Sequence, residues 1–320
     1  MTTLYIDHKN VELDVSGKTL LIRENGERSG SIPLGLLERV VVMTNTRLET
    51  RVINTLAEND TGLVILQRRS RENVAILMGK PHNDCRRRQQ QALISMDEPR
   101  AATIVQTLIR LKLQQQMKLL IHLHNSRSEK RKPLTDGIRT LEKILKEVRN
   151  LDHTSPGSIG QLRGYEGAGA AHYFPAYASV FPPALDFTER NRRPPRDPVN
   201  ACLSLGYTLL HAEAVMSIYR AGLDPYMGFL HDPQHGRESL ACDLVEPLRP
   251  MLDRHIGSLF RERILRPEHF TDDQGACRMG KEARKRYYQE YEQRLARKLR
   301  RILSISVYRL IRFFDHHETQ

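Results

Sequence analysis

The spacing of apolar residues changes near residue 85, and this change constrains the fold more than any other feature of the chain. Before it, short runs at 11–15 and 19–23 have the composition of β-strands and are separated by turn residues. The Asn25-Gly26 pair that follows is a hairpin signal. These runs are therefore predicted to form a meander of antiparallel strands, within a small, mostly-β domain of residues 1–85.

From residue 86 onwards, apolar positions recur at helical spacing. Ile104, Leu108 and Leu111 follow one another at four and three residues, and the region 138–148 repeats this period. The sequence therefore predicts an α+β protein in which a larger all-α domain, residues 86–320, follows the β domain. Further expected elements are strands at 40–43, 63–66 and 74–77, a helix at 48–58, and helix starts at Ser155-Pro156 and Asp197-Pro198.

The net charge is concentrated in the second domain. The chain has 50 Lys and Arg against 38 Asp and Glu, a formal charge of +12. Residues 1–85 carry 11 of each sign, whereas residues 86–320 carry 39 basic and 27 acidic residues, so the whole excess lies in the helical part. A basic stretch at 278–312, interleaved with tyrosines at 287, 288 and 291, fits contact with phosphates. The expected partner is a polyanion such as DNA.

Several classes of protein are excluded or disfavoured. No run approaches the ~18 consecutive apolar residues of a membrane span, and the first residues lack the pattern of a signal peptide, so we expect a cytoplasmic protein without a membrane partner. No P-loop motif is present, so no nucleotide cofactor is expected. The cysteines form no CxxC pair and are expected to be reduced and mostly buried; they are Cys85, Cys202, Cys242 and Cys277.

The first candidate site is Glu166. It is the one carboxylate in a helical stretch, residues 162–171, that otherwise contains glycine and alanine. Three glycines in a helix cost roughly 1 kcal/mol each relative to alanine, so some packing or functional role should offset them. Tight helix packing around a solvated Glu166 explains the pattern about equally well.

The second candidate site combines His231, which ends an apolar run, with Asp243 and Glu246. These two acids are three residues apart, so a helix would place both carboxylates on one face, with Ser239 one turn earlier. Like charges so placed repel unless a cation lies near them. Pro247 removes one helical hydrogen bond and could bend the helix there. A solvated acidic face with a structural His231 is the alternative.

Other polar clusters are weaker candidates. His122 and His124 are two residues apart on an expected helix and cannot converge on one ion. His316 and His317 are expected to lie in a disordered tail. The arginines of the loop at 190–196 could contact either DNA or a neighbouring subunit.

Taken together, the segments 162–167, 193–200, 222–231 and 239–247 resemble the CRISPR-associated Cas-one endonuclease/integrase family, whose motifs they match in order and spacing. The resemblance covers nearly the whole chain. It implies an N-terminal β-sandwich domain that makes dimerisation or partner contacts, and a C-terminal all-helical catalytic domain.

The resemblance also implies an activity, partners and a site. The activity is that of a metal-dependent DNA endonuclease and integrase, which joins DNA 3′-hydroxyl ends into a CRISPR array as new spacers. The implied partners are double-stranded prespacer DNA, the array, a second copy of the chain and the small Cas-two protein. By motif, the catalytic residues fall on Glu166, His231, Asp243 and Glu246. Of these, Glu166, His231 and Glu246 would hold Mg²⁺ or Mn²⁺, with Asp243 as a companion acid.

Two other functions compete with this interpretation. One is a basic scaffold that binds DNA and a partner without catalysis, although carboxylates in a phosphate-binding groove would only weaken such a scaffold. The other is a structure-selective nuclease for branched DNA, which would use the same site on a different substrate.

Overall fold

The described residues fall into two structural units. The computed structural model describes residues 2–66, 74–80, 82, 84–126, 131–191, 194–232 and 234–316. The units comprise Met1–Asn83 and Asp84–Gln320, so the division lies two residues before the boundary at 85/86 expected from the change in apolar spacing. Each unit has its own set of buried apolar residues.

The N-terminal unit is a two-layer β structure. Its elements are β1 (Thr2–Ile6), β2 (Val11–Ser16), β3 (Thr19–Glu24), β4 (Glu27–Pro33), β5 (Leu37–Val42), β6 (Thr46–Leu48), α1 (Thr50–Glu58), β7 (Gly62–Leu66) and β8 (Val74–Leu77). One sheet has the strand order β1-β5-β7-β8 and the other β4-β3-β2-β6. Val40 and Leu63 of the first sheet share one core with Leu13 and Leu20 of the second. Two sheets enclosing one core form the β-sandwich that was expected, which confirms the fold class.

Strand direction differs between the meander and the rest of the unit. The β2-β3-β4 meander is antiparallel, as expected, and the β3–β4 turn has Asn25 and Gly26 at φ 52° and 87°, as an Asn-Gly hairpin requires. The pairs β1–β5, β5–β7 and β2–β6 are parallel, which the sequence did not predict. Apolar alternation along a strand records which side chains are buried, and it says nothing about the neighbouring strand or its direction.

The C-terminal unit is mostly helical. Its principal helices are α2 (Arg86–Met96), α3 (Glu98–Ser126), α4 (Arg131–Asn150), α5 (Ser158–Ala178), α6 (Pro198–Arg220), α7 (Ser239–Val245), α8 (Arg249–Arg261), α9 (Lys281–Tyr291) and α10 (Arg297–His316). It also contains one hairpin, β9 (Phe270–Asp273) with β10 (Ala276–Met279), so the all-α prediction is wrong for this short segment. The turn of the hairpin places Gln274 and Gly275 at φ 55° and 79°, which a glycine accommodates without strain.

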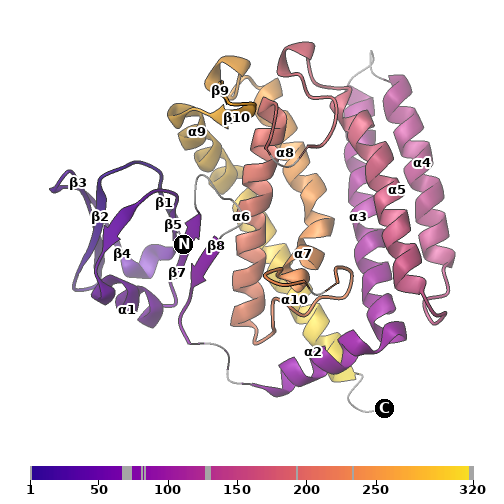
Figure 1. The fold of residues 1–320 in the computed structure, drawn as a ribbon, viewed down its shortest axis with the longest axis horizontal. Coiled ribbons are helices and arrows are strands. Elements are labelled where there is room, and N and C mark those ends of the chain that lie inside the picture. The colour runs from indigo at the N-terminus through magenta and orange to yellow at the C-terminus, as the bar shows by residue number, and fades with distance from the viewer. Residues whose placement is uncertain are drawn as a thin grey trace. The chain divides into compact units, whose positions relative to one another are not determined.

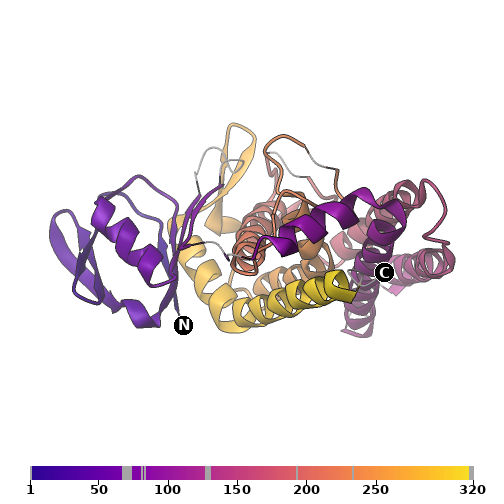
Figure 2. The same cartoon turned by 90° about the horizontal axis from the view of Figure 1, so that it is seen from below.

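The long helices pack in two groups within this unit. Helices α3, α4 and α5 contact one another side by side, and α6 packs against α8 and α10 (Figures 1 and 2). Helix α3 also contacts α8, which joins the two groups. The candidate site residues lie on α3, α5, α7 and the segments next to α7.

Helix α6 forms the centre of the unit. Its length and a mean hydropathy of 1.3 over 18 residues would suffice for a membrane span, but 72% of that window is buried within the structure. A core helix passes the same test, and this burial is what a core helix requires. Asp197 caps α6 by accepting a hydrogen bond from the backbone N–H of Asn200, so the helix start expected at Asp197-Pro198 is confirmed.

The helix start expected at Ser155-Pro156 is corrected. Helix α5 begins at Ser158, after Gly157 at φ 78°, and not at Pro156. The reason is that the Asp152 carboxylate accepts hydrogen bonds from Thr154 and Ser155, which holds these residues in a turn outside the helix.

The tyrosines of the basic C-terminal stretch lie in the core. Tyr287, Tyr288 and Tyr291 are buried, so the prediction that they face a phosphate-binding surface is wrong. Their apolar rings fill space beneath the exposed cations of the same stretch. His316 is the last residue of α10 and does not lie in a tail, whereas His317 lies outside the described residues.

The cysteines and the Arg-rich loop complete the comparison with the sequence. All four cysteines are free; Cys202 and Cys277 are buried, while Cys85 is exposed. In the loop, residues 192–193 lie outside the described residues. Arg190 donates hydrogen bonds to the side chains of Asn200 and Ser204, so it holds the start of α6.

Candidate active site

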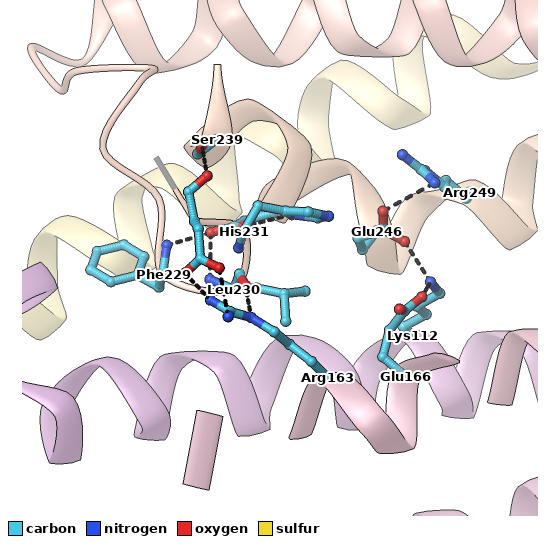
Figure 3. A network of polar contacts seen from close by, with 11 residues as sticks. Lys112, Arg163, Glu166, Phe229, Leu230, His231, Ser239, Glu246 and Arg249 are labelled. Atoms are coloured by element: carbon cyan, nitrogen blue, oxygen red, sulfur yellow. Dashed lines mark hydrogen bonds and ion pairs between the residues drawn. The ribbon is translucent and has the colours of Figure 1, made fainter. Parts of the chain in front are cut away.

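A lysine that the sequence analysis overlooked lies at the centre of the candidate site. Lys112 is on the buried side of α3, and its side chain is only 7% exposed. Its ammonium contacts the carboxylate of Glu166 on α5 and lies 2.6 Å from Oε2 of Glu246. Two acids that are 80 residues apart in the chain therefore converge on one positive charge (Figure 3).

Glu166 reaches this position because α5 packs closely on α3. A Cβ on Gly169 would lie 2.6 Å from the Leu113 side chain of α3, so any larger residue at this crossing would require Leu113 to shift. The other two glycines of the stretch, Gly164 and Gly167, face open space. Helix packing thus explains one glycine of the three, and Glu166 is not the solvated acid of the alternative interpretation, because it is paired with Lys112.

Glu246 is a buried carboxylate held by two cations. It directly follows α7, where the helix gives way to a short 3₁₀ turn at Glu246–Leu248, so the bend expected at Pro247 is present. Arg249 Nη1 lies 3.0 Å from Glu246 Oε1, opposite the contact with Lys112. Burial alone would raise the pKa of Glu246, but the charges of Arg249 and then Lys112 lower it to about 2. The carboxylate is therefore ionised at neutral pH.

His231 is held by Asp243, which has no exposed surface. Asp243 Oδ2 accepts the backbone N–H groups of Phe229 and Leu230 at 2.6 and 2.9 Å. Its Oδ1 accepts the backbone N–H of His231 at 3.0 Å and the imidazole Nδ1 at 2.7 Å. Because a carboxylate oxygen accepts hydrogen bonds, Nδ1 is the donor in this contact, and a neutral imidazole here therefore has its lone pair on Nε2. In this arrangement Asp243 orients His231.

The loop that carries His231 fits tightly against α7. A Cβ on Gly228 would lie 2.7 Å from atoms of Ser239 and 2.9 Å from Asp243 Oδ2, so only glycine allows this approach. Ser239 Oγ also donates to the backbone carbonyl of Asp232. The polar side chains of α7 thus hold the 228–232 segment in place.

Arg163 fastens the same loop to α5. Its Nε donates to the Leu230 carbonyl at 2.6 Å, and its two terminal nitrogens contact the Asp232 carboxylate at 2.8 and 2.5 Å. Arg163 lies three residues before Glu166, so the helix that supplies one acid also positions the loop that supplies the imidazole (Figure 3).

The structure brings two of the three expected metal ligands together directly. Glu166 and Glu246 share the Lys112 ammonium, which stands where a cation would lie. The ring of His231 extends towards Glu246 in Figure 3. Within the described ranges, no group of three or more His, Cys, Asp or Glu side chains is arranged as a ready metal cage. That the three ligands meet on one metal ion stays a prediction.

The alternative interpretation, a solvated acidic face formed by Asp243 and Glu246, is wrong, because Asp243 is 0% exposed and Glu246 is 3% exposed. Three backbone N–H groups and one imidazole use both oxygens of Asp243.

Two of the residues missed by sequence reasoning left a detectable signal. Lys112 falls on the apolar stripe of α3, three or four residues from Ile109 and Leu108, where a lysine needs a buried partner. Arg249 follows Glu246 at three residues, a spacing that allows an ion pair. Arg163 left none, because its partners in the 230–232 loop are remote in sequence.

Comparison with known proteins agrees with this architecture. The family model described as CRISPR associated protein Cas1 matches residues 4–293. A protein from Thermodesulfovibrio yellowstonii named CRISPR-associated endonuclease Cas1 1 is 39% identical over 297 residues, covering 92% of this chain and 91% of that protein. CRISPR-associated endonuclease Cas1 2 from Rhodospirillum rubrum is 33% identical and is matched over 86% of its length.

Solved structures share the fold. A Cas1 protein from Thermotoga maritima superposes with a TM-score of 0.83 over 98% of this chain and 97% of that one, at 20% identity. A casposase bound to an integration product also gives 0.83 at 20% identity, over 98% of this chain and 90% of that one.

The fold and its relatives define an endonuclease and integrase class of protein, built from a β-sandwich and a basic helical unit with buried acids. The chain belongs to the Cas1 family, the Cas-one family indicated by its motifs, which acts in the acquisition of CRISPR spacers.

Proposed function

We propose that the chain is a divalent-metal-dependent enzyme that joins DNA 3′-hydroxyl ends to the phosphodiester backbone of a CRISPR array. Glu166, Glu246 and His231 would hold the ion. The observation that carries this proposal is the convergence of Glu166 and Glu246 on one buried cation position, now taken by the Lys112 ammonium.

The donor set fits a small divalent cation. Two carboxylates and one imidazole are ligands that suit Mn²⁺, while carboxylates with water suit Mg²⁺. When bound, such an ion lowers the pKa of an attacking hydroxyl and offsets charge on the phosphate. Water in place of the 3′-hydroxyl gives hydrolysis at the same site, so cutting and joining share one set of residues.

The other polar residues of the site hold these ligands in place. Asp243 keeps the proton on Nδ1 of His231, which leaves Nε2 to coordinate. Arg249 holds the ionised carboxylate of Glu246 from the side opposite Lys112. Glu166 and Glu246 would hold the ion with carboxylates that now contact the Lys112 ammonium, so Lys112 would have to give up these contacts.

A non-catalytic DNA scaffold gives no reason for this arrangement. Burying Glu246 costs free energy, and a groove that only binds phosphate gains nothing from acids. The burial of Glu246 among Lys112 and Arg249 therefore supports a catalytic site over a scaffold.

We further propose partners for the reaction. A Cas6-RT-Cas1–Cas2 complex contains a chain that superposes on this one with a TM-score of 0.83 at 22% identity, and this chain spans 35% of it. By analogy with that assembly, the chain would act on DNA with a Cas2-type partner. We propose in addition that it forms a homodimer and acts in the cytoplasm.

The test uses the full chain with a Cas2-type partner, a supercoiled array and Mn²⁺. Glu166→Gln, Glu246→Gln and His231→Ala should each abolish joining, whereas Glu142→Gln, an exposed acid on α4, should not. As an independent readout, Mn²⁺ should raise the melting temperature of the unaltered chain and of Glu142→Gln but not of the three site variants. Joining that persists in the site variants would refute the assignment.

A further inference from the structure

The helical unit has a second polar hollow away from the acids. A pocket of about 800 Å³ lies between α3, α8, the segment after α5 and the start of α10. Its lining includes none of Lys112, Glu166, His231 or Glu246. This volume is within the ~300–1,000 Å³ of sites that enclose a small ligand.

The lining of the pocket is basic. It contains six Lys or Arg side chains and no Asp or Glu; the six are Lys118, Arg254, Arg261, Arg263, Arg294 and Lys298. Arg261 and Arg294 pair with Glu262, and Arg294 also pairs with Glu290; both acids lie outside the lining. Among the described residues, no carboxylate forms an ion pair with the other four. Cations gathered around one hollow repel one another, and an anionic ligand removes this cost.

A buried histidine in the lining lacks a hydrogen-bond partner. His255 is 7% exposed, and its Nε2 makes no hydrogen bond within the part of the chain that the structure describes. Buried polar atoms are nearly always hydrogen-bonded, so the unpaired Nε2 of His255 is an unusual polar group beside the pocket. Burial, and then the charge of Arg294, lowers the pKa of His255 to about 4, so the imidazole is neutral at pH 7 and can donate or accept one hydrogen bond.

The pocket also has an aromatic wall and an irregular helix. Phe181 is half-buried and makes edge contacts with Tyr177 at 5.0 Å and Phe260 at 6.1 Å between ring centroids. Phe181 is thus held within a cluster of aromatic rings that also includes Phe187. Arg294 belongs to a π-helical turn, Glu292–Ala296, and such turns are frequent at functional sites.

We propose that this pocket binds a nucleotide, with its phosphate among Arg254, Lys298 and Lys118 and its base against Phe181. Aromatic rings that stack bases within a basic groove are how proteins hold unpaired DNA. A duplex does not fit, because its major groove alone is ~12 Å wide. The nucleotide would come from an unpaired stretch of the DNA substrate or from the free pool. The choice of ligand rests on the proposed DNA activity, but the pocket contains none of the metal-binding residues.

A fluorescent reporter can test the stacking. The chain has no tryptophan, so Phe181→Trp places a single tryptophan at the pocket wall. In EDTA, where no joining occurs, a short oligothymidylate should quench this fluorescence, and a duplex of equal length should not. Quenching by thymidine monophosphate but not by the oligonucleotide would assign the free nucleotide as the ligand. If neither quenches, or if inorganic phosphate alone has the same effect, the proposal is wrong.

A charge-reversal pair provides a second test with phenylalanine in place. Arg254→Glu combined with Lys298→Glu should weaken binding of the quenching ligand at least tenfold. If that ligand is the oligonucleotide, the dependence of log affinity on log salt should also decrease by about 1.4, since each phosphate contact contributes ~0.7 for single strands. Arg297→Glu is the matched control, because Arg297 adjoins Lys298, is exposed and lies outside the lining. Equal losses in the control and the double variant would overturn the proposal. Binding here that survives Glu166→Gln separates this inference from the metal site.

Discussion

The geometry around Asp243 predicts that replacing one atom of its side chain causes a large loss of stability. Asp243→Asn replaces one carboxylate oxygen by an NH₂ group. Each oxygen of Asp243 accepts two N–H groups, so whichever oxygen is replaced, two hydrogen bonds are lost and donors then face donors. Hydrogen bonds to a charged group contribute ~1.5–3 kcal/mol each. Because the neutral amide also avoids the cost of burying a charge, we expect the lower end of this range for the two lost bonds, a decrease of about 3 kcal/mol in the free energy of unfolding.

The measurement is urea unfolding followed by circular dichroism at 222 nm, which reports chiefly on the helical unit. The control is Asp232→Asn, on the same loop, where the carboxylate is 67% exposed and paired with Arg163. An exposed pair contributes ~0–1 kcal/mol, so the control should be almost as stable as the unaltered chain. Nitrogen NMR of His231 should also show a single Nδ1–H tautomer in the control and a mixture of tautomers in Asp243→Asn. Equal stability of the two variants would refute the role assigned to Asp243.

Two further predictions follow from the packing and charges. Gly228→Ala should lower the free energy of unfolding by ~1–3 kcal/mol, because the added methyl group overlaps the α7 backbone. Gly164→Ala should raise it by ~0.5–1 kcal/mol, because residue 164 faces open space. Denaturation curves that rank these two variants in the reverse order would contradict the packing. The other prediction concerns the dependence of stability on pH. Burial alone would lower the pKa of His211, but hydrogen bonds with Cys242 and Glu238 raise it to about 9. Since this folded-state pKa lies above the unfolded value of 6.5, the stabilisation is complete below pH 6.5 and is lost as the pH rises to 9. The stability difference between the unaltered chain and Glu238→Gln should therefore shrink across that window, and a difference independent of pH would show that the pair is not ionic.

Much of the architecture could be predicted from local patterns. The change from strand to helix spacing near residue 85 depends only on neighbouring residues, as does the Asn25-Gly26 turn, which places both residues at positive φ. The parallel pairs β1–β5 and β5–β7 could not be predicted in this way, because their partners are joined by long connections. The Tyr287 ring was misplaced for a similar reason. Its basic neighbours suggested a surface position, but the burial of Tyr287 depends on α6, where the Cys202 carbonyl accepts a hydrogen bond from the Tyr287 hydroxyl.

The amino-acid sequence by itself determined the two kinds of domain, the basic character of the second, and the types of residue available for chemistry: acids at 166, 243 and 246 and an imidazole at 231. Only the tertiary structure decided how these groups divide their roles. It placed Lys112 between Glu166 and Glu246, and it used every acceptor of Asp243 to hold the His231 loop. The physical reason is that a carboxylate oxygen that already accepts two hydrogen bonds, as each oxygen of Asp243 does, has no lone pair left for a cation. Which donors reach it depends on the packing of helices that are distant in the chain.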